Sequence, residues 1–263
     1  MGHLSHESLK QLAQAAEEIT FDKDVKLPNC EPCNKAFAKR KPFGTAPRAE
    51  KEGELIHVDL VFPLKPTAYN GSKGYISMTD DSTGEMEVYF IKKKTEARDK
   101  LEEYCAHKKA SKTPVAAIGS DGERVIIEGN FRAWMKKEGI QWRPTVAYHP
   151  EQNGMAEVNQ HILHLQAIVI LQDAGLPPFL WPLALEHVGY LKNRSPLRRL
   201  KWITPIEKKT GRQPDLTNLY IWGSEVWYHI PKEKRIKSEK ITSCSKMSYL
   251  VGYDSHSIKV IKI

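Results

Sequence analysis

The chain has 263 residues, enough for one large domain or for a medium-sized domain with appendages. Its 40% apolar and 27% charged residues suit an ordinary globular core, and its net charge of +8 favours a polyanionic partner such as DNA or RNA. No stretch approaches the roughly 18 apolar residues of a membrane span, and the N-terminus lacks an apolar signal region, so we expect an intracellular protein with no membrane segment.

The first segment, residues 1–45, combines a helical pattern with a cysteine pair. Its apolar residues have roughly helical spacing, namely Leu4, Leu9, Leu12, Ala15, Ala16 and Ile19. Pro28 and Pro32 then interrupt regular structure, and the basic stretch Lys39-Arg-Lys-Pro42 follows. Cys30 and Cys33 are the two of four cysteines that are close enough to share chemistry. We expect a small N-terminal module and a basic linker.

From about residue 54 the pattern changes to strands and helices in alternation. Three β-branched and apolar runs with a turn signal between them predict an antiparallel meander, and the segments that follow alternate helix with strand. The expected elements are strands 55–62, 75–80 and 86–92, a helix over 95–112, a strand over 114–119, a helix over 131–138 and a strand over 140–144.

Long helices follow the strands. One is expected from near Gln152, and its most apolar run, Ile162–Leu171, is typical of a buried helix. Pro177 and Pro178 separate it from a second helix over 179–193, and the tail contains short strands at 226–230 and 249–253. This order predicts an α/β fold, a mixed sheet packed between helices. We expect a core over 50–213 and a C-terminal extension over 214–263.

Three carboxylates are placed where a metal site would need them. Asp59 interrupts an apolar strand, Asp121 follows the strand over 114–119, and Glu157 stands near the start of the long helix. Mg²⁺ and Mn²⁺ prefer oxygen ligands, and two such ions can activate a nucleophile and stabilise a leaving oxygen in phosphodiester transfer. Taken singly, the same residues also suit a strand-end cap, a turn residue and a helix N-terminal charge.

Three motifs that contain these residues resemble the integrase core of long-terminal-repeat retrotransposons, closest to the copia type. They are His57-Val-Asp-Leu60, Ser120-Asp-Gly122 and Tyr148-His-Pro-Glu-Gln-Asn-Gly-Met-Ala-Glu157. The 35 residues between Asp121 and Glu157 match the spacing of the family's Asp–Asp–Glu triad. Further landmarks match downstream, namely Gly175-Leu-Pro177, Trp181, Asn193-Arg-Ser-Pro196, Thr204-Pro205 and Leu250-Val-Gly-Tyr253.

The resemblance implies an RNase H-like fold and a set of functional residues. Asp59, Asp121 and Glu157 would be the catalytic ligands of Mg²⁺ or Mn²⁺. The enzyme would trim the 3′ ends of element DNA and join them to target DNA in the nucleus, and it would act as a homo-oligomer. Gln152 and Asn153 match the loop that leads into the Glu157 helix, and with Lys92 and Lys93 they are candidate DNA contacts, although Asn153-Gly154 also suits a simple turn.

The N-terminal segment resembles the zinc-binding module of the same proteins. His3, Cys30 and Cys33 match three of the four ligands that a closed zinc site requires. The family's first histidine lies upstream of the position of His3, and His6 is closer to His3 than the family's spacing allows. We therefore expect either a Zn²⁺ site with an unusual fourth ligand or a truncated arm.

Departures from the family pattern leave rival functions open. Gly122-Glu-Arg124 shortens the loop after Asp121, and Val158 and Ile168 stand where the family has arginine. The leading expectation is metal-dependent DNA integration. The main alternative is a catalytically inactive nucleic-acid-binding remnant of a retrotransposon polyprotein, and a third is an interaction module that multimerises through its helices.

Overall fold

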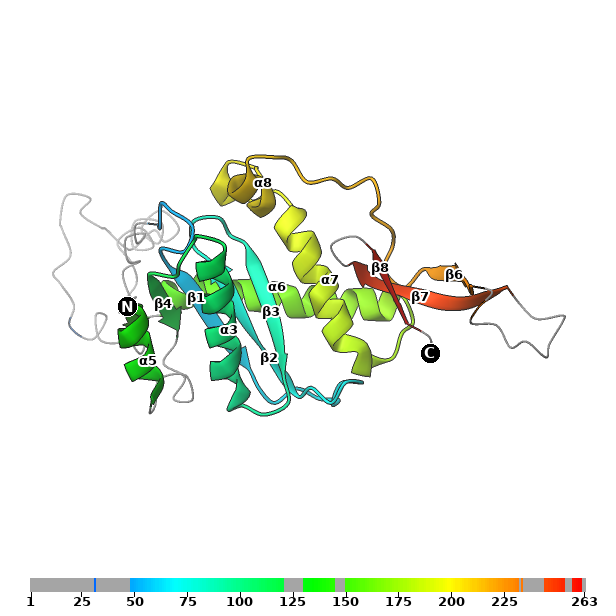
Figure 1. The fold of residues 1–263 in the computed structure, drawn as a ribbon, viewed down its shortest axis with the longest axis horizontal. Coiled ribbons are helices and arrows are strands. Elements are labelled where there is room, and N and C mark those ends of the chain that lie inside the picture. Colours follow the sequence, from blue (N-terminus) through cyan, green and yellow to red (C-terminus); the bar gives the residue numbers. More distant parts are fainter. Residues whose placement is uncertain are drawn as a thin grey trace, which may run out of the picture. The chain divides into compact units, whose positions relative to one another are not determined.

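A five-stranded mixed sheet with helices on both faces forms the larger part of the described chain (Figure 1). The structure is a computed structural model, and it describes residues 31, 48–120, 130–144, 150–231, 233, 244–253 and 257–261, with the backbone alone at 130, 144 and 150–159. The chain divides into two compact units, residues 1–45 and 46–263, and the elements below belong to the second. The expected N-terminal helix lies outside the described residues.

The sheet has the strand order β3-β2-β1-β4-β5, which places β1 at its centre. β1 pairs antiparallel with β2, and β2 pairs antiparallel with β3. β4 and β5 follow helical crossovers and run parallel to β1. The strands are β1 Ile56–Val61, β2 Gly74–Asp80, β3 Met86–Ile91, β4 Ala117–Ser120 and β5 Gln141–Pro144.

The helices cover both faces of this sheet, as an α/β fold requires. They are α3 Glu96–Ala110, α5 Asn130–Glu138, α6 Pro150–Asp173 and α7 Trp181–Arg194, with a short helix α8 Pro205–Thr210 and two 3₁₀ turns, η1 Pro178–Leu180 and η2 Arg198–Leu200. The fold class and the order of the main elements predicted from the sequence are confirmed.

Two hydrophobic layers lie on opposite faces of the sheet. On one face, Ile56, Val58 and Leu60 of β1 pack with residues of α3 and α5, such as Leu101 and Phe131. On the other face, residues of β2 and β3 pack with α6 and α7. Because side chains of a strand alternate between faces, β1 contributes its odd-numbered residues, Asp59 among them, to the α6 and α7 side.

The prediction that Ile162–Leu171 is a buried helix is wrong for half of its surface. Leu163, Ala167 and Leu171 are buried, but the side chains on the opposite side of α6 are 40% to 61% exposed, namely Ile162, Leu165, Ile168 and Val169. The sequence shows apolar residues all around this helix, and such a pattern cannot tell which side the rest of the chain covers.

Some boundaries differ from the expectation. β4 begins at Ala117 rather than at Pro114. Pro114 has no N–H to donate to a neighbouring strand, and the Ala116 N–H donates instead to the Gly53 carbonyl oxygen at 2.8 Å, outside the sheet. The second helix begins at Trp181, after the η1 turn. The sequence analysis missed α8, although Thr204-Pro205 with Glu207 is a helix-start pattern and Thr204 Oγ1 accepts a hydrogen bond from the Glu207 N–H at 3.1 Å.

The tail forms a second, three-stranded sheet of order β6-β7-β8. Its antiparallel strands are β6 Glu225–His229, β7 Ser245–Tyr253 and β8 Ile258–Ile261. The first two were predicted with shifted boundaries, and β8 was not predicted. Trp222 connects this sheet to the core. Its indole N–H donates to the carbonyl oxygen of Val251 in β7 at 2.9 Å, and its side chain is buried in the same cluster as residues of α6 and α7. No helix in the part of the chain that the structure describes combines the length and apolar character that a bilayer span requires.

Candidate active site

Asp59 lies in the middle of β1, the central strand of the five-stranded sheet. The side chain is buried, with 9% of the residue exposed, and its Oδ1 accepts a hydrogen bond from the Leu60 N–H at 3.0 Å. Aspartate is disfavoured inside strands, and burying a carboxylate costs free energy unless other groups compensate. Its burial on the central strand makes Asp59 a candidate functional residue.

Tyr75 connects the Asp59 face of the sheet to helix α6. Tyr75 stands opposite Val61 in the β1–β2 register, and its hydroxyl is hydrogen-bonded to Nε2 of His164 at 2.8 Å. Burial raises the pKa of Tyr75, and the negative charge of Asp59 raises it further, while a hydrogen bond with Gln160 lowers it. Asp59, Tyr75, Gln160 and His164 therefore lie in one neighbourhood between β1, β2 and α6.

Glu157 belongs to the same side of α6. The helix contains the whole range from Pro150 to Asp173, and Glu157 precedes Gln160 by three residues and His164 by seven. Positions three and seven apart lie on one face of an α-helix. Since Gln160 and His164 both meet Tyr75, position 157 lies on the sheet-facing side of α6, about two turns from His164 toward the N-terminal end of the helix.

The strand beside β1 leads to the third predicted carboxylate. β4 runs parallel to β1 and ends at Ser120, and Asp121 is the next residue in the sequence. Parallel strands end at the same edge of a sheet, so the carboxyl ends of β1 and β4 are neighbours. Asp121 itself lies outside the described residues.

A network around Asp81 holds the other end of β1, and the sequence analysis missed it. The Asp81 carboxylate accepts hydrogen bonds from Arg48 Nη1 at 2.7 Å and from the Ala49 N–H at 2.8 Å, and its Oδ1 lies 3.0 Å from His57 Nε2. Burial alone would raise the pKa of Asp81, but the hydrogen bonds from His57, Ala49 and Arg48 hold it well below its usual value.

This network positions the strand that carries Asp59. His57 and Asp59 are two residues apart in β1 and therefore share a face. Arg199 adds a further contact, since its Nη1 donates to the Asp81 carbonyl oxygen at 2.7 Å. In the sequence, Asp81-Ser-Thr-Gly84 was interpreted only as a turn, and no local signal shows that a residue as distant as Arg199 would reach it.

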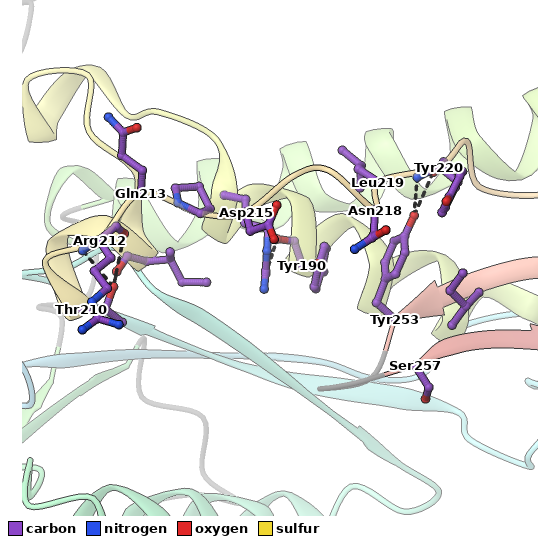
Figure 2. A pocket seen from close by; sticks show the side chains of 14 residues that line it. Tyr190, Thr210, Arg212, Gln213, Asp215, Asn218, Leu219, Tyr220, Tyr253 and Ser257 are labelled. Carbon is purple, nitrogen blue, oxygen red and sulfur yellow. Dashed lines mark hydrogen bonds between the residues drawn. The ribbon is translucent and has the colours of Figure 1, made fainter.

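A separate groove of about 720 Å³ lies between α7, α8 and β7 (Figure 2). Its wall is an aromatic stack, in which the Tyr190 and Tyr253 ring centroids are 5.0 Å apart and the Arg194 guanidinium lies 3.4 Å from the Tyr190 ring centre. Its single carboxylate is that of Asp215, which accepts hydrogen bonds from Thr217. The groove therefore lacks the several carboxylates of a catalytic metal centre.

The sequence is similar to those of plant retrotransposon polyproteins. It is 25% identical over 252 residues to the retrovirus-related Pol polyprotein from transposon TNT 1-94 of Nicotiana tabacum, a match that covers 95% of this chain and 19% of that protein. It is 25% identical over 255 residues to the Pol polyprotein from transposon RE2 of Arabidopsis thaliana, which covers 95% of this chain and 17% of that protein. The chain resembles an integrase core of the copia type.

The fold agrees with this resemblance. A chain of the cryo-EM structure of the simian T-cell lymphotropic virus intasome, in complex with the PP2A regulatory subunit B56 gamma, superposes with a TM-score of 0.55 and 16% identity. The match covers 88% of this chain and 84% of that one. The mixed five-stranded sheet with its flanking helices is thus an RNase H-like integrase fold. No family model matches the chain.

The integrase-like chain spans less than a fifth of the length of the plant polyproteins that it matches. Within its described residues, no three His, Cys, Asp or Glu side chains gather closely enough to hold a metal ion. This statement does not extend to the predicted triad, because Asp121 and the Glu157 side chain lie outside the described residues, as do the predicted zinc ligands His3, Cys30 and Cys33.

The predicted DNA contacts lie on two elements. Gln152 and Asn153 belong to the first turn of α6, where the backbone alone is described. Lys92 and Lys93 are exposed just after β3, and the Lys92 N–H donates to Glu96 Oε2 at 2.8 Å, which fixes the entry into α3. Because β3 is two strands from β1 and runs parallel to it, its end lies at the same edge of the sheet as the carboxyl ends of β1 and β4.

Proposed function

We propose that the chain is the catalytic core of a metal-dependent polynucleotidyl transferase that trims the 3′ ends of retrotransposon DNA and joins them to target DNA. The observation that carries the proposal is the position of Asp59. This buried carboxylate lies on the central strand, beside the strand that leads to Asp121 and under the face of α6 that includes position 157. The similarity to integrase-containing polyproteins supports the same function.

The β1–β4 register supports a close approach of Asp59 and Asp121. Ile56 lies opposite Ile118 and His57 lies opposite Gly119, an offset of 62 positions. The same offset separates Asp59 from Asp121 in the sequence. In our proposal the two carboxylates therefore leave neighbouring strands side by side, and Glu157 approaches them from α6.

The donor set fits Mg²⁺ or Mn²⁺. Asp59, Asp121 and Glu157 offer only carboxylate oxygens, which are the ligands that these hard cations prefer, and no thiol or imidazole is required. When bound, such ions supply Lewis-acid activation of an oxygen nucleophile and stabilise negative charge at the phosphate. A bound cation would also offset the cost of burying Asp59 as a carboxylate.

The chain's own residues would hold and orient the reacting DNA. The oxygen of a water, and later that of a DNA 3′-hydroxyl, forms a bond to phosphorus while the bond from phosphorus to the leaving 3′ oxygen breaks. Lys92 and Lys93, at the same edge of the sheet, would contact backbone phosphates, and Gln152 and Asn153 at the start of α6 would lie next to the DNA. The Asp81–His57 network keeps β1 in place while the DNA is bound.

The proposed partners follow from the same chemistry. The substrates are element-end DNA and target DNA, in keeping with the net charge of +8, and the protein would act as a homo-oligomer in the nucleus. Zinc binding by His3, Cys30 and Cys33 remains a prediction from the sequence.

A strand-transfer assay tests the proposal. Purified chain is incubated with Mn²⁺ or Mg²⁺, a panel of labelled duplex ends and a plasmid target, beside the Asp59→Asn and Glu157→Gln variants. We expect metal-dependent joining that falls by at least about 1,000-fold in either variant, because each removes a charge that the reaction needs. The exposed Asp99 of α3 gives a matched control, Asp99→Asn, which should keep full activity.

If the folded wild-type chain binds DNA but joins none with any end in the panel, the inactive nucleic-acid-binding remnant becomes the better description. Equal activity of the wild type and the Asp59→Asn variant would remove Asp59 from the site.

A further inference from the structure

The stretch from Lys192 to Arg212 carries most of the positive charge of the chain. It contains eight lysines and arginines and one acidic residue, Glu207, which gives it a net charge of +7, while the whole chain has +8. The stretch comprises the end of α7, the η2 turn and helix α8, which packs against α7. Charge gathered in one stretch attracts a polyanion more strongly than the same charge spread over the surface.

Half of these cations are exposed and have no acidic partner. In the part of the chain that the structure describes, no carboxylate pairs with four exposed side chains, namely Arg198, Lys201, Lys208 and Arg212. Two neighbours have structural contacts instead. Lys209 pairs with Glu85 at 2.8 Å, and Arg199 donates to the Asp81 carbonyl oxygen. The four exposed cations are therefore available to bind phosphates.

Trp202 lies within this stretch in an unusual backbone conformation. Lys201 and Trp202 have φ angles of +58° and +68°, a region that bulky residues rarely adopt. Backbone hydrogen bonds close a tight loop over 197–203, in which the Trp202 N–H donates to the Leu197 carbonyl oxygen at 3.0 Å. The tryptophan is 67% exposed, so a strained loop presents a large aromatic ring to solvent. Backbone strain of this kind is concentrated at functional sites.

The groove between α7, α8 and β7 adjoins the same stretch. Arg194, the last residue of α7, and Arg212 both line it, and Figure 2 shows the amides of Gln213 and Asn218 there as well. Burial lowers the pKa of Arg194, and no carboxylate of the described residues forms an ion pair with its guanidinium. The groove thus offers a half-buried cation for an anion and amide groups that can form hydrogen bonds with a base.

We propose that the loop 197–203, helix α8 and the adjoining groove form one surface that binds single-stranded DNA. Its exposed lysines and arginines contact the phosphates, and the ring of Trp202 stacks on a base. A stacking ring needs an unpaired base, because each base of a duplex is already covered by its neighbours on both faces. The groove receives an adjacent nucleotide, with its phosphate beside Arg194.

This surface is separate from the proposed metal centre. Arg199 holds the loop against Asp81, which follows the end of β2, and that end of β2 pairs with the start of β1. Asp121 follows β4 at the opposite edge of the sheet, since β4 runs parallel to β1. The choice of DNA over RNA rests on the proposed function. Binding is measured without metal, and Asp59→Asn should bind as the wild type does, so loss of binding and loss of strand transfer are distinct results.

Fluorescence anisotropy of the full chain with labelled oligothymidine of about 15 nucleotides tests the proposal, beside a duplex of the same length. Trp202→Ala should weaken binding of the single strand by at least about 10-fold and binding of the duplex by less than about 2-fold, because only the unpaired base loses a stacking partner. Trp202→Phe, which keeps a ring, should stay within about 3-fold of the wild type. The Arg198→Glu/Lys201→Glu variant should bind the single strand at least about 10-fold more weakly, with a smaller dependence on salt.

Matched controls keep the test specific. Trp227→Ala removes a tryptophan that is 66% exposed on β6, outside the basic stretch, and it should bind as the wild type does. Lys136→Glu/Lys137→Glu makes the same change of charge on exposed residues of α5 and should cost less than about 3-fold. Equal effects of Trp202→Ala and Trp227→Ala, or equal effects of Trp202→Ala on single strand and duplex, would overturn the proposal. Tighter binding of oligouridine than of oligothymidine would overturn the assignment to DNA.

Discussion

The two layers on either side of the central sheet bury polar groups in opposite ways. On the α3 side, Lys108 is almost fully buried and its Nζ lies 2.8 Å from Glu85 and 3.1 Å from Glu52. On the α6 and α7 side, the buried titratable groups include two imidazoles, His164 and His187, and burial lowers the pKa of both. The α3 side thus contains a buried ion pair, whereas on the α6 and α7 side burial favours the neutral form of the two histidines.

This difference has a consequence for the candidate metal centre. Asp59 and position 157 belong to the layer on the α6 and α7 side, and α6 brings no Lys or Arg near them between Val158 and Gln172. A lysine in that layer could pair with the carboxylates, as Lys108 pairs with Glu85 on the opposite side. The arrangement therefore suits carboxylates that bind a metal cation.

The largest effect on stability is expected on the α3 side of the sheet, where Lys108 pairs with buried carboxylates. Lys108→Ala should lower the free energy of unfolding by about 1 to 3 kcal/mol, because Glu85 and Glu52 lose their buried cation and keep only the more exposed Lys209. Urea denaturation at pH 7 measures this change. The exposed pair of Lys100 and Glu103 gives the control, since Lys100→Ala should cost no more than about 0.5 kcal/mol. Equal effects of the two substitutions would contradict the contrast between the layers.

On acidification, the layer on the α6 and α7 side should destabilise the fold before the layer on the α3 side does. Burial lowers the pKa of His187 from 6.5 to about 4. The folded state thus resists a proton that the unfolded chain accepts, and stability falls as the pH drops below 6.5. Between pH 7 and pH 5 this group should cost about 2 kcal/mol of unfolding free energy.

The His187→Phe variant tests the assignment, because it keeps a ring beside Tyr190 and Tyr253 and cannot titrate. Its unfolding free energy should depend less on pH over this interval, with a smaller slope left by His164, whose pKa is also lowered. An unchanged slope in the variant would assign the acid response to other groups. The layer on the α3 side should lose stability only at lower pH, since its hydrogen bonds with Lys108 and Lys209 outweigh burial and lower the pKa of Glu85.

Much of the core was predictable from the sequence, because alternation and helical spacing are local properties. The strand with Asp59 and the helix with Glu157 follow from such patterns, and the family motifs relate both to Asp121. The role of Asp81 was not predictable, since Arg48 and Arg199 reach it from distant parts of the chain. The same limit explains the error at Ile162–Leu171, where composition shows an apolar helix and the packing partner alone decides which side is covered.

The most direct test of the metal centre is Mn²⁺ binding by isothermal titration calorimetry in the absence of DNA. We expect that Asp59→Asn, Asp121→Asn and Glu157→Gln each weaken Mn²⁺ binding by at least about 10-fold, while Asp99→Asn leaves it unchanged. If the three variants bind Mn²⁺ as tightly as the wild type, the three carboxylates do not form a shared site and the account is wrong.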